Sequence, residues 1–190
     1  MRVKDDTKRE AIIEETIAIV FEKGFAGIKM ADLAKRVGIS VSTLYVYFKN
    51  KEDLIISISG ELFKKVSEMS SKEVTDDLPY KLKLKALWLY WVNYSINHTK
   101  ETSFIHQVKQ SPYYDKIPPS ILEAKHKIGM DLFELGKKEG LIKNMDNEIL
   151  ASIIGALLSE YVKLIHNKKI KMDQKNTDAM FSMVWDAIKN

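Results

Sequence analysis

Hydroxyl-bearing and aromatic side chains lie close together in the stretch GISVSTLYVYFKNKEDL, which covers residues 38–54. Ser40, Ser42 and Thr43 come first, and Tyr45 and Tyr47 follow directly after them. Serine and threonine hydroxyls can meet several kinds of base edge in the major groove of DNA. A tyrosine hydroxyl stands on a rigid apolar stem, so it can reach a phosphate at a low cost in side-chain entropy. These residue types therefore offer hydrogen bonding to a nucleic acid.

Positive charge is concentrated in the same region. The window from Gly27 to Lys51 holds one acid, Asp32, and five cations, which are Lys29, Lys35, Arg36, Lys49 and Lys51. The formal net charge of the whole chain is +4, so the remainder is close to neutral. Contacts of lysine and arginine with phosphates supply most of the sequence-independent affinity for DNA. A solvated face of a helical domain is the alternative interpretation of such a patch.

The apolar residues of this stretch have helical spacing. In a helix over residues 40–47, Leu44 and Phe48 share one face, because they are four residues apart. That face can pack against Leu33 and Val37. The hydroxyl groups and tyrosines then lie on other faces, and the small side chains at the start of the helix let its backbone approach a groove closely.

Turn and capping residues separate this helix from its neighbours. We expect a preceding helix over 29–37 that ends at Gly38, a residue able to take the left-handed conformation of a helix stop. Ser40 can cap the next helix, and Asn50 can cap the one after it. Two helices joined by a tight turn that contains glycine are typical of the helix-turn-helix. Lys29 and Lys51 would then lie at helix N-termini, where the ammonium group and the free backbone amides both favour a phosphate.

The rest of the chain also shows helical periodicity, and no stretch alternates convincingly. We therefore predict an all-α fold of about nine helices. A first helix should begin near Thr7 and end at Gly24, and Pro79 follows a polar boundary over 70–77. The longer helices are expected over 51–69, 80–98, 101–110, 119–139, 146–166 and 173–189.

Composition narrows the possible classes of protein. The chain has no cysteine, which excludes disulfides and thiolate chemistry. The first ten residues are highly charged, which argues against a secretory signal. The longest apolar run, around 149–158, is shorter than a membrane span requires. We expect a soluble, cytoplasmic protein without a membrane partner.

Several short motifs in this region resemble the N-terminal signature of the tetracycline-repressor (TetR) family of bacterial and archaeal transcriptional regulators. The matching elements are Lys23-Gly24-Phe25, Ala31-Asp32-Leu33-Ala34, Gly38-Ile39-Ser40, Thr43-Leu44-Tyr45, Tyr47-Phe48 and Lys51-Glu52-Asp53-Leu54. The resemblance covers roughly residues 5–60. Two positions differ from the family pattern, since Lys29 stands where serine or threonine is common and Ser42 where glycine or alanine is common.

The resemblance implies a DNA-binding domain over residues 1–50, with the motif at about 28–47, and a ligand-binding and dimerisation domain over 51–190. Residues 51–69 would form the linking helix. Tyr45, Tyr47 and Lys51 should contact phosphates, whereas Val41, Ser42 and Thr43 should face base edges. The complete expected DNA-binding set is Lys29, Ser40, Val41, Ser42, Thr43, Tyr45, Tyr47 and Lys51.

Two-fold dimers read half-sites about 34–36 Å apart, or a multiple of that distance, because a single short helix contacts too few base pairs for specificity. The last two helices carry apolar stripes that could pair two copies, and the alternative is that the stripes form the core of one copy. The resemblance favours the homodimer. The expected interface residues are Ile149, Ile153, Ala156, Leu157, Met180 and Val184.

Aromatic residues and methionine are concentrated in the middle helices, where they indicate either a plain core or a small-molecule site. In the TetR family, which the chain resembles, this region binds a small-molecule effector. We expect the effector to be mostly apolar or aromatic. The candidate residues are Trp88, Trp91, Tyr94, His98, Phe104, Met130 and Phe133. No cluster of acids lines these helices, so a strongly cationic ligand is less favoured.

The predicted function is a sequence-specific, ligand-responsive regulator, most often a repressor in the resembled family, that binds a palindromic operator in double-stranded DNA. One alternative is an all-helical adaptor that does not bind DNA. Another is a helical-bundle enzyme, because Glu123 and His126 have the Glu-x-x-His spacing of di-iron proteins. Those proteins need a second copy of the motif, which this chain lacks. We therefore expect no catalysis, metal or cofactor.

Overall fold

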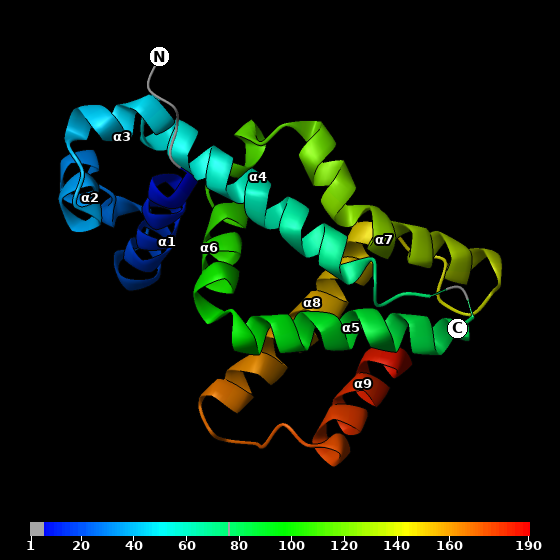
Figure 1. Cartoon of the computed structure of the whole chain (residues 1–190). Helices are drawn as coiled ribbons and strands as arrows, with labels where there is room; N and C mark the ends of the chain where they lie inside the picture. The colour runs from blue at the N-terminus through cyan, green and yellow to red at the C-terminus, as the bar shows by residue number, and fades with distance from the viewer. Residues whose placement is uncertain (1–5, 76) are drawn as a thin grey trace. The chain divides into compact units, whose positions relative to one another are not determined.

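The computed structural model describes residues 6–75 and 77–190, and within them the chain folds into nine α-helices and two short 3-10 helices (Figure 1). The elements are α1 (Asp6–Lys23), η1 (Phe25–Gly27), α2 (Met30–Val37), α3 (Val41–Tyr47), α4 (Lys51–Ser70), α5 (Tyr80–Asn97), α6 (Thr99–Lys109), η2 (Tyr114–Lys116), α7 (Pro119–Lys138), α8 (Asn147–His166) and α9 (Gln174–Ile188). Extended pairing in this part of the chain is limited to an isolated bridge between Ile142 and Lys189. The predicted all-α class is confirmed.

Glycines end three of these helices. The φ angles of Gly24, Gly38 and Gly140 are 63°, 74° and 67°. These angles are positive, and residues with a Cβ rarely adopt them. Gly38 follows α2 in a left-handed conformation and donates its N–H back to the last turn of that helix. The stops expected at Gly24 and Gly38 are confirmed, because the requirement is local and glycine meets it best.

The contacts divide the chain into two compact units. The first unit contains residues 1–64 and 98–122, and the second contains 65–97 and 123–190. The division falls inside α4, whereas the sequence places a boundary at residue 50. Each unit therefore combines segments that are distant in sequence, and α4 contributes to both.

The first unit is built around α1. This helix packs against both α2 and α6, and α2 packs against α3. Its core consists of fully buried aliphatic and aromatic side chains, which include Ile12, Val20, Leu33, Leu44 and Phe48. Helix α3, which carries Ser42 and Tyr45, therefore packs against a well-buried core.

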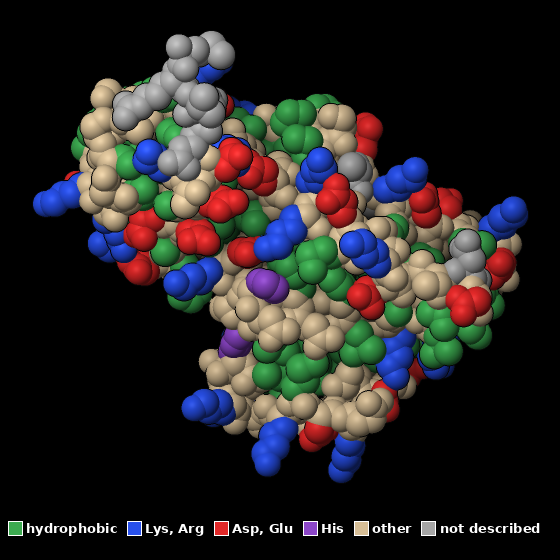
Figure 2. Space-filling view, viewed as in Figure 1, with side chains coloured by type: hydrophobic (Ala, Val, Ile, Leu, Met, Phe, Trp, Pro, Cys, Tyr) green, Lys and Arg blue, Asp and Glu red, His purple; other side chains and the backbone are tan. Residues whose placement is uncertain are grey.

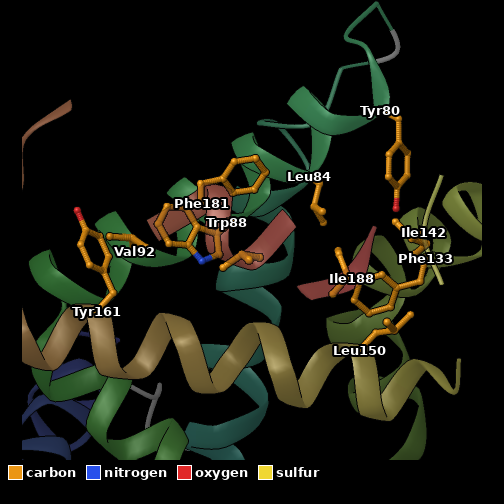
Figure 3. Close-up of a cluster of buried hydrophobic side chains, with 11 residues drawn as sticks. Tyr80, Leu84, Trp88, Val92, Phe133, Ile142, Leu150, Tyr161, Phe181 and Ile188 are labelled. Atoms are coloured by element: carbon orange, nitrogen blue, oxygen red, sulfur yellow. The ribbon is translucent and has the colours of Figure 1, made fainter. Parts of the chain in front are cut away.

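The second unit has its core between α5, α7, α8 and α9 (Figure 3). Helix α5 packs against both α8 and α9, and these two helices pack against each other. A hydrogen bond of 2.8 Å between the hydroxyls of Tyr161 and Thr177 joins α8 to α9 inside this core. The two polar groups satisfy each other there, which removes most of the cost of burying them.

Close packing of α7 against Tyr80 leaves no room for a side chain at Gly136. A Cβ at this position would lie 2.1 Å from Tyr80 Oη and 2.4 Å from its Cζ. Tyr80 cannot easily move aside, because it is buried in the core of the second unit. Burial also raises the pKa of Tyr80 to about 12, with the charge of Glu139 as a smaller cause.

Replacing Gly136 by alanine should therefore destabilise the protein by about 1–3 kcal/mol through overpacking. Gly129 is the matched control, since it lies in the same helix and a Cβ there meets nothing within 4 Å. Gly129→Ala should be neutral or stabilise by up to about 1 kcal/mol, because alanine favours the helix. Urea unfolding of both variants measures the difference. Equal stability of Gly136→Ala and the parent would contradict this packing.

Candidate nucleic-acid interface

Helix α3 is fixed on α2 by apolar contacts and by the turn between them. Leu44 and Phe48 point into the core of the first unit and are buried, as Leu33 is. In the turn, Ile39 donates its backbone N–H to Ala34 O at 3.0 Å. The predicted division of α3 into a buried apolar face and other, outward faces is confirmed.

The outward faces of α3 carry the residues expected to read DNA. Val41, Ser42 and Tyr45 are exposed, whereas Thr43 and Tyr47 are half-buried. Tyr45 keeps 48% of its surface accessible, although it is an aromatic residue in a small domain. Val46, which was not among the residues expected from the sequence, is still more exposed. Exposed apolar groups on a short polar helix are available to a partner such as the thymine methyl group.

The hydroxyl of Ser40 organises the start of α3. Its Oγ accepts the backbone N–H of Thr43 at 3.1 Å, which is the expected capping bond. The same atom lies 2.9 Å from Ser42 Oγ and 2.7 Å from Thr43 Oγ1. Ser40 is therefore occupied within the helix terminus, whereas Ser42 and Thr43 retain hydrogen-bonding capacity that they can direct outward.

The basic side chains differ in how much of their charge is available. Arg36 forms ion pairs with two acids of α1, Glu15 at 2.5 Å and Glu22 at 3.8 Å, so its charge is largely compensated. Lys29 is exposed at the residue before α2, and Lys51 is half-buried at the first position of α4. On the face shown in Figure 2, acidic and basic side chains are interspersed. Because Arg36 is paired, the number of cations in the sequence overstates the positive charge that is available to a phosphate.

A reciprocal pair of hydrogen bonds fixes the start of α4. Asn50 Oδ1 accepts the backbone N–H of Asp53, and Asp53 Oδ2 accepts that of Lys49, both at 2.8 Å. This arrangement satisfies two amides at the helix terminus and confirms the expected cap at Asn50. An ion pair between Glu52 and Lys116 joins the same turn to the segment after α6. The backbone that presents Lys51 is therefore well defined.

Helix α6 is tied to the end of α1 within the first unit. Gln107 Nε2 donates to the backbone oxygen of Val20 at 3.1 Å, close to the end of α1. The ring of Phe25 packs edge-on against those of Phe104 and Tyr113, with centroids 5.6 and 5.3 Å apart. Phe104, an expected effector residue, is thus a buried contact between α6 and the turn after α1.

The other expected effector residues are distributed over both units. His98 belongs to the first unit, and its Nδ1 lies 3.7 Å from Glu101 Oε1. Trp91 and Tyr94 belong to the second unit and form an aromatic cluster with Tyr90, with centroids about 6 Å apart. Tyr90 was not among the residues expected from the sequence. The remaining three, Trp88, Met130 and Phe133, lie in or against the core of the second unit.

The expected dimer residues separate into two groups. Ile149 and Ala156 on α8 are exposed, and Ile153, Leu157 and Met180 are half-buried. Val184 is 0% exposed within the second unit, so it belongs to the core and cannot line a surface. Met183, its neighbour on α9, is 59% exposed. The sequence could not distinguish these two because both are apolar and adjacent.

The enzyme alternative depends on possible metal ligands. No group of three or more His, Asp or Glu side chains that could hold an ion occurs among residues whose side chains are described. Of the Glu-x-x-His pair, Glu123 is exposed, and the side chain of His126 lies outside the described part.

Comparison with known proteins agrees with this geometry. Residues 12–58 match the family model described as "Bacterial regulatory proteins, tetR family". Residues 60–190 match the model described as "Tetracyclin repressor-like, C-terminal domain". Together the two models account for nearly all of the described helices.

Individual relatives match either a part or most of the chain. The fatty acid metabolism regulator protein of Bacillus subtilis is 32% identical over 73 residues, and this match covers only 38% of either chain. An uncharacterised HTH-type transcriptional regulator of Haemophilus influenzae is 25% identical over 79% of both chains. A solved TetR-family transcription regulator from Marinobacter aquaeolei has the same fold, with a TM-score of 0.86, 22% identity and full coverage of both chains.

Proposed function

The chain belongs to the TetR family of bacterial regulatory proteins, and from this membership we propose that it is a ligand-responsive transcriptional regulator that binds a palindromic operator as a homodimer. Residues 1–50 contact the DNA, residues 51–190 bind the effector and pair the copies, and residues 51–69 link the two functions. Repression relieved by an effector is the proposed mode of action.

The observation that carries the DNA-binding part is the outward side of α3. Val41, Ser42 and Tyr45 are exposed there, although a buried aliphatic and aromatic face holds the helix in place. Ser42 and Thr43 supply hydrogen bonds to base edges, and Val41 supplies an apolar contact. Tyr47 and Lys51 are half-buried and accessible at the following turn, where they contact phosphates.

Dimerisation is supported by the composition and exposure of α8. This helix is long and apolar enough to cross a membrane by length and composition, yet little of its most apolar window is buried. Exposed Ile149 and Ala156 lie on it, together with Ser152 and Gly155, which permit close approach of a second helix. A helix that exposes so much apolar surface needs a cover. The same face of a second copy provides it and matches the two-fold symmetry of a palindrome.

Response to an effector is supported by the contacts of α6. The hydrogen bond from Gln107 and the ring contacts of Phe25 connect α6 to α1 inside the first unit. The chain passes from α5 of the second unit directly into α6 of the first. An effector that prefers one arrangement of α5 can therefore shift the population of α6 and α1, and with it the position of α3.

The decisive experiment is selection of bound sequences from random duplex DNA with the purified protein. We expect an inverted repeat whose half-sites are centred about 34–36 Å apart or a multiple of it. The affinity for the selected sequence should fall steeply as the salt concentration rises. Enrichment of no sequence, with binding that does not depend on salt, would favour the adaptor alternative and overturn the proposal.

A further inference from the structure

Helix α3 carries an aliphatic side chain at the centre of its outward side. Leu44 marks the inward side, because it is fully buried in the core of the first unit. Ser42 and Val46 are each two residues from Leu44, so they lie about 160° around the helix axis from it. Val46 is 53% exposed, more than either Val41 or Tyr45. A partner that approaches α3 from outside therefore meets Val46 beside the short side chain of Ser42.

Exposed apolar side chains of the first unit are concentrated on this helix. The described part of the unit has four exposed large hydrophobic residues, and three of them, Val41, Tyr45 and Val46, lie on α3. The fourth, Phe21, lies on α1. A single exposed valine is ordinary on a protein surface. Three apolar side chains on two turns of a helix, opposite a buried face, indicate a surface that contacts a partner.

The sequence of α3 lacks the side chains that read bases by paired hydrogen bonds. It is VSTLYVY, without arginine, lysine, asparagine, glutamine or an acid. Guanine is most often read by arginine or lysine, and adenine by asparagine or glutamine. Ser42 and Thr43 offer hydroxyls, but a hydroxyl suits several base edges and therefore discriminates weakly. Both hydroxyls also lie within 2.9 Å of Ser40 Oγ.

The two arginines in the described part of the chain are paired with carboxylates. Arg36 pairs with Glu15 and Glu22 of α1. Arg9 donates from Nη1 to Glu61 Oε2 at 2.9 Å, and its Nη2 pairs with the other oxygen of the same carboxylate. These guanidinium groups are therefore held inside the first unit rather than offered to guanine. Discrimination between bases is left to the apolar groups of α3.

We propose that Val46 reads the C5-methyl group of a thymine, so that each half-site carries an A·T pair at the position that Val46 faces. This methyl group is the apolar feature of the major groove, where the other three bases present only hydrogen-bonding groups. Val46 is then a specificity-determining residue. The inference rests on the proposed DNA binding and adds the base that is read and the side chain that reads it.

The test removes the methyl group and keeps every hydrogen-bonding group of the base. The selected operator is synthesised with deoxyuridine in place of one symmetric pair of thymines at a time, and each duplex is titrated with the protein. We expect at least one pair of positions at which the affinity falls about 15-fold, as the loss of one buried methyl group in each half-site predicts. An affinity that is unchanged at every position would overturn the proposal.

Val46→Ala assigns the contact to this side chain. Because Val46 is exposed, the variant loses no core contact, and alanine favours the helix. It should bind the unmodified operator more weakly than the parent and no longer distinguish thymine from deoxyuridine at the responding pair. Phe21→Ala is the matched control, an exposed apolar residue of the same unit on α1, and should keep both the affinity and the distinction. A Val46→Ala variant with the full 15-fold loss would exclude Val46 as the reader.

A second measurement uses the unaltered protein. The responding T·A pair is replaced by C·G and then by 5-methylcytosine paired with guanine, which returns a methyl group to the same place in the groove. We expect C·G to weaken binding and the methylated pair to recover most of the loss, because α3 has no side chain that pairs with adenine. No recovery on methylation would show that hydrogen bonds read this position and would contradict the proposal.

The two proposals fail separately. Salt-dependent binding to a palindrome that is indifferent to thymine methyl groups would support the DNA-binding function and exclude this role of Val46. Selection that enriches no sequence would overturn both.

Discussion

Arginine in place of Ala156 should turn the protein into a monomer and lower its affinity for a two-half-site operator by at least about 100-fold. Ala156 is exposed in the middle of the apolar face of α8 that we propose as the dimer contact. In a two-fold interface both copies contribute the same face, so the substitution would place two bulky charges in an apolar interface. A monomer also loses the effective concentration that links the second half-site to the first.

Leu82 provides the matched control for this substitution. It is an exposed apolar residue of α5, 46% accessible, and lies in the same unit. Leu82→Arg should leave both the molecular mass in solution and operator affinity unchanged. Sedimentation measures the first, and titration of the selected duplex measures the second. A dimeric Ala156→Arg variant that binds normally would place the interface elsewhere.

Local requirements explain why so much of the first unit could be predicted from the sequence. Gly38 is the residue best able to follow α2 in a left-handed conformation, and Ser40 has the side chain that caps α3. Leu44 and Phe48 are related by helical spacing and reach the same core. Each of these signals involves residues a few positions apart, and all point to one arrangement. When local preferences agree in this way, the structure of the segment can be predicted from its sequence.

The features that the sequence did not reveal depend on contacts between distant segments. Val184 and Met183 are adjacent and both apolar, and only the packing of α9 on α5 and α8 decides which is buried. Arg36 resembles the other cations of its window until α1 brings Glu15 and Glu22 beside it. Both assignments required the fold of a whole unit.

The same distinction applies to the effector residues. Aromatic spacing identified Trp88 as a candidate, but it could not show that this side chain is buried in the core of the second unit. Phe104 has the same aromatic character, yet it packs against Phe25 in the first unit. Aromatic composition therefore indicates where cores lie, but it does not indicate which of them binds a ligand.

Lys51→Ala should lower operator affinity by roughly 10- to 100-fold and reduce its dependence on salt. Lys51 is the first residue of α4, where the capped terminus and its own ammonium group favour a phosphate. A dimer loses one such contact in each copy, so the slope of log affinity against log salt should fall by about 2. Titration at several salt concentrations measures both quantities.

Lys175→Ala separates this local contact from the effect of net charge. Lys175 is exposed on α9, far in sequence from the helix-turn-helix, and its removal changes the charge of the chain by the same amount. For Lys175→Ala we expect little change in slope. The order of base preferences should be unchanged in both variants, since a phosphate contact positions the protein without reading sequence. A Lys51→Ala variant with the parental slope would mean that α4 does not meet the DNA backbone at its first residue, and the orientation of α3 in the groove would have to be revised.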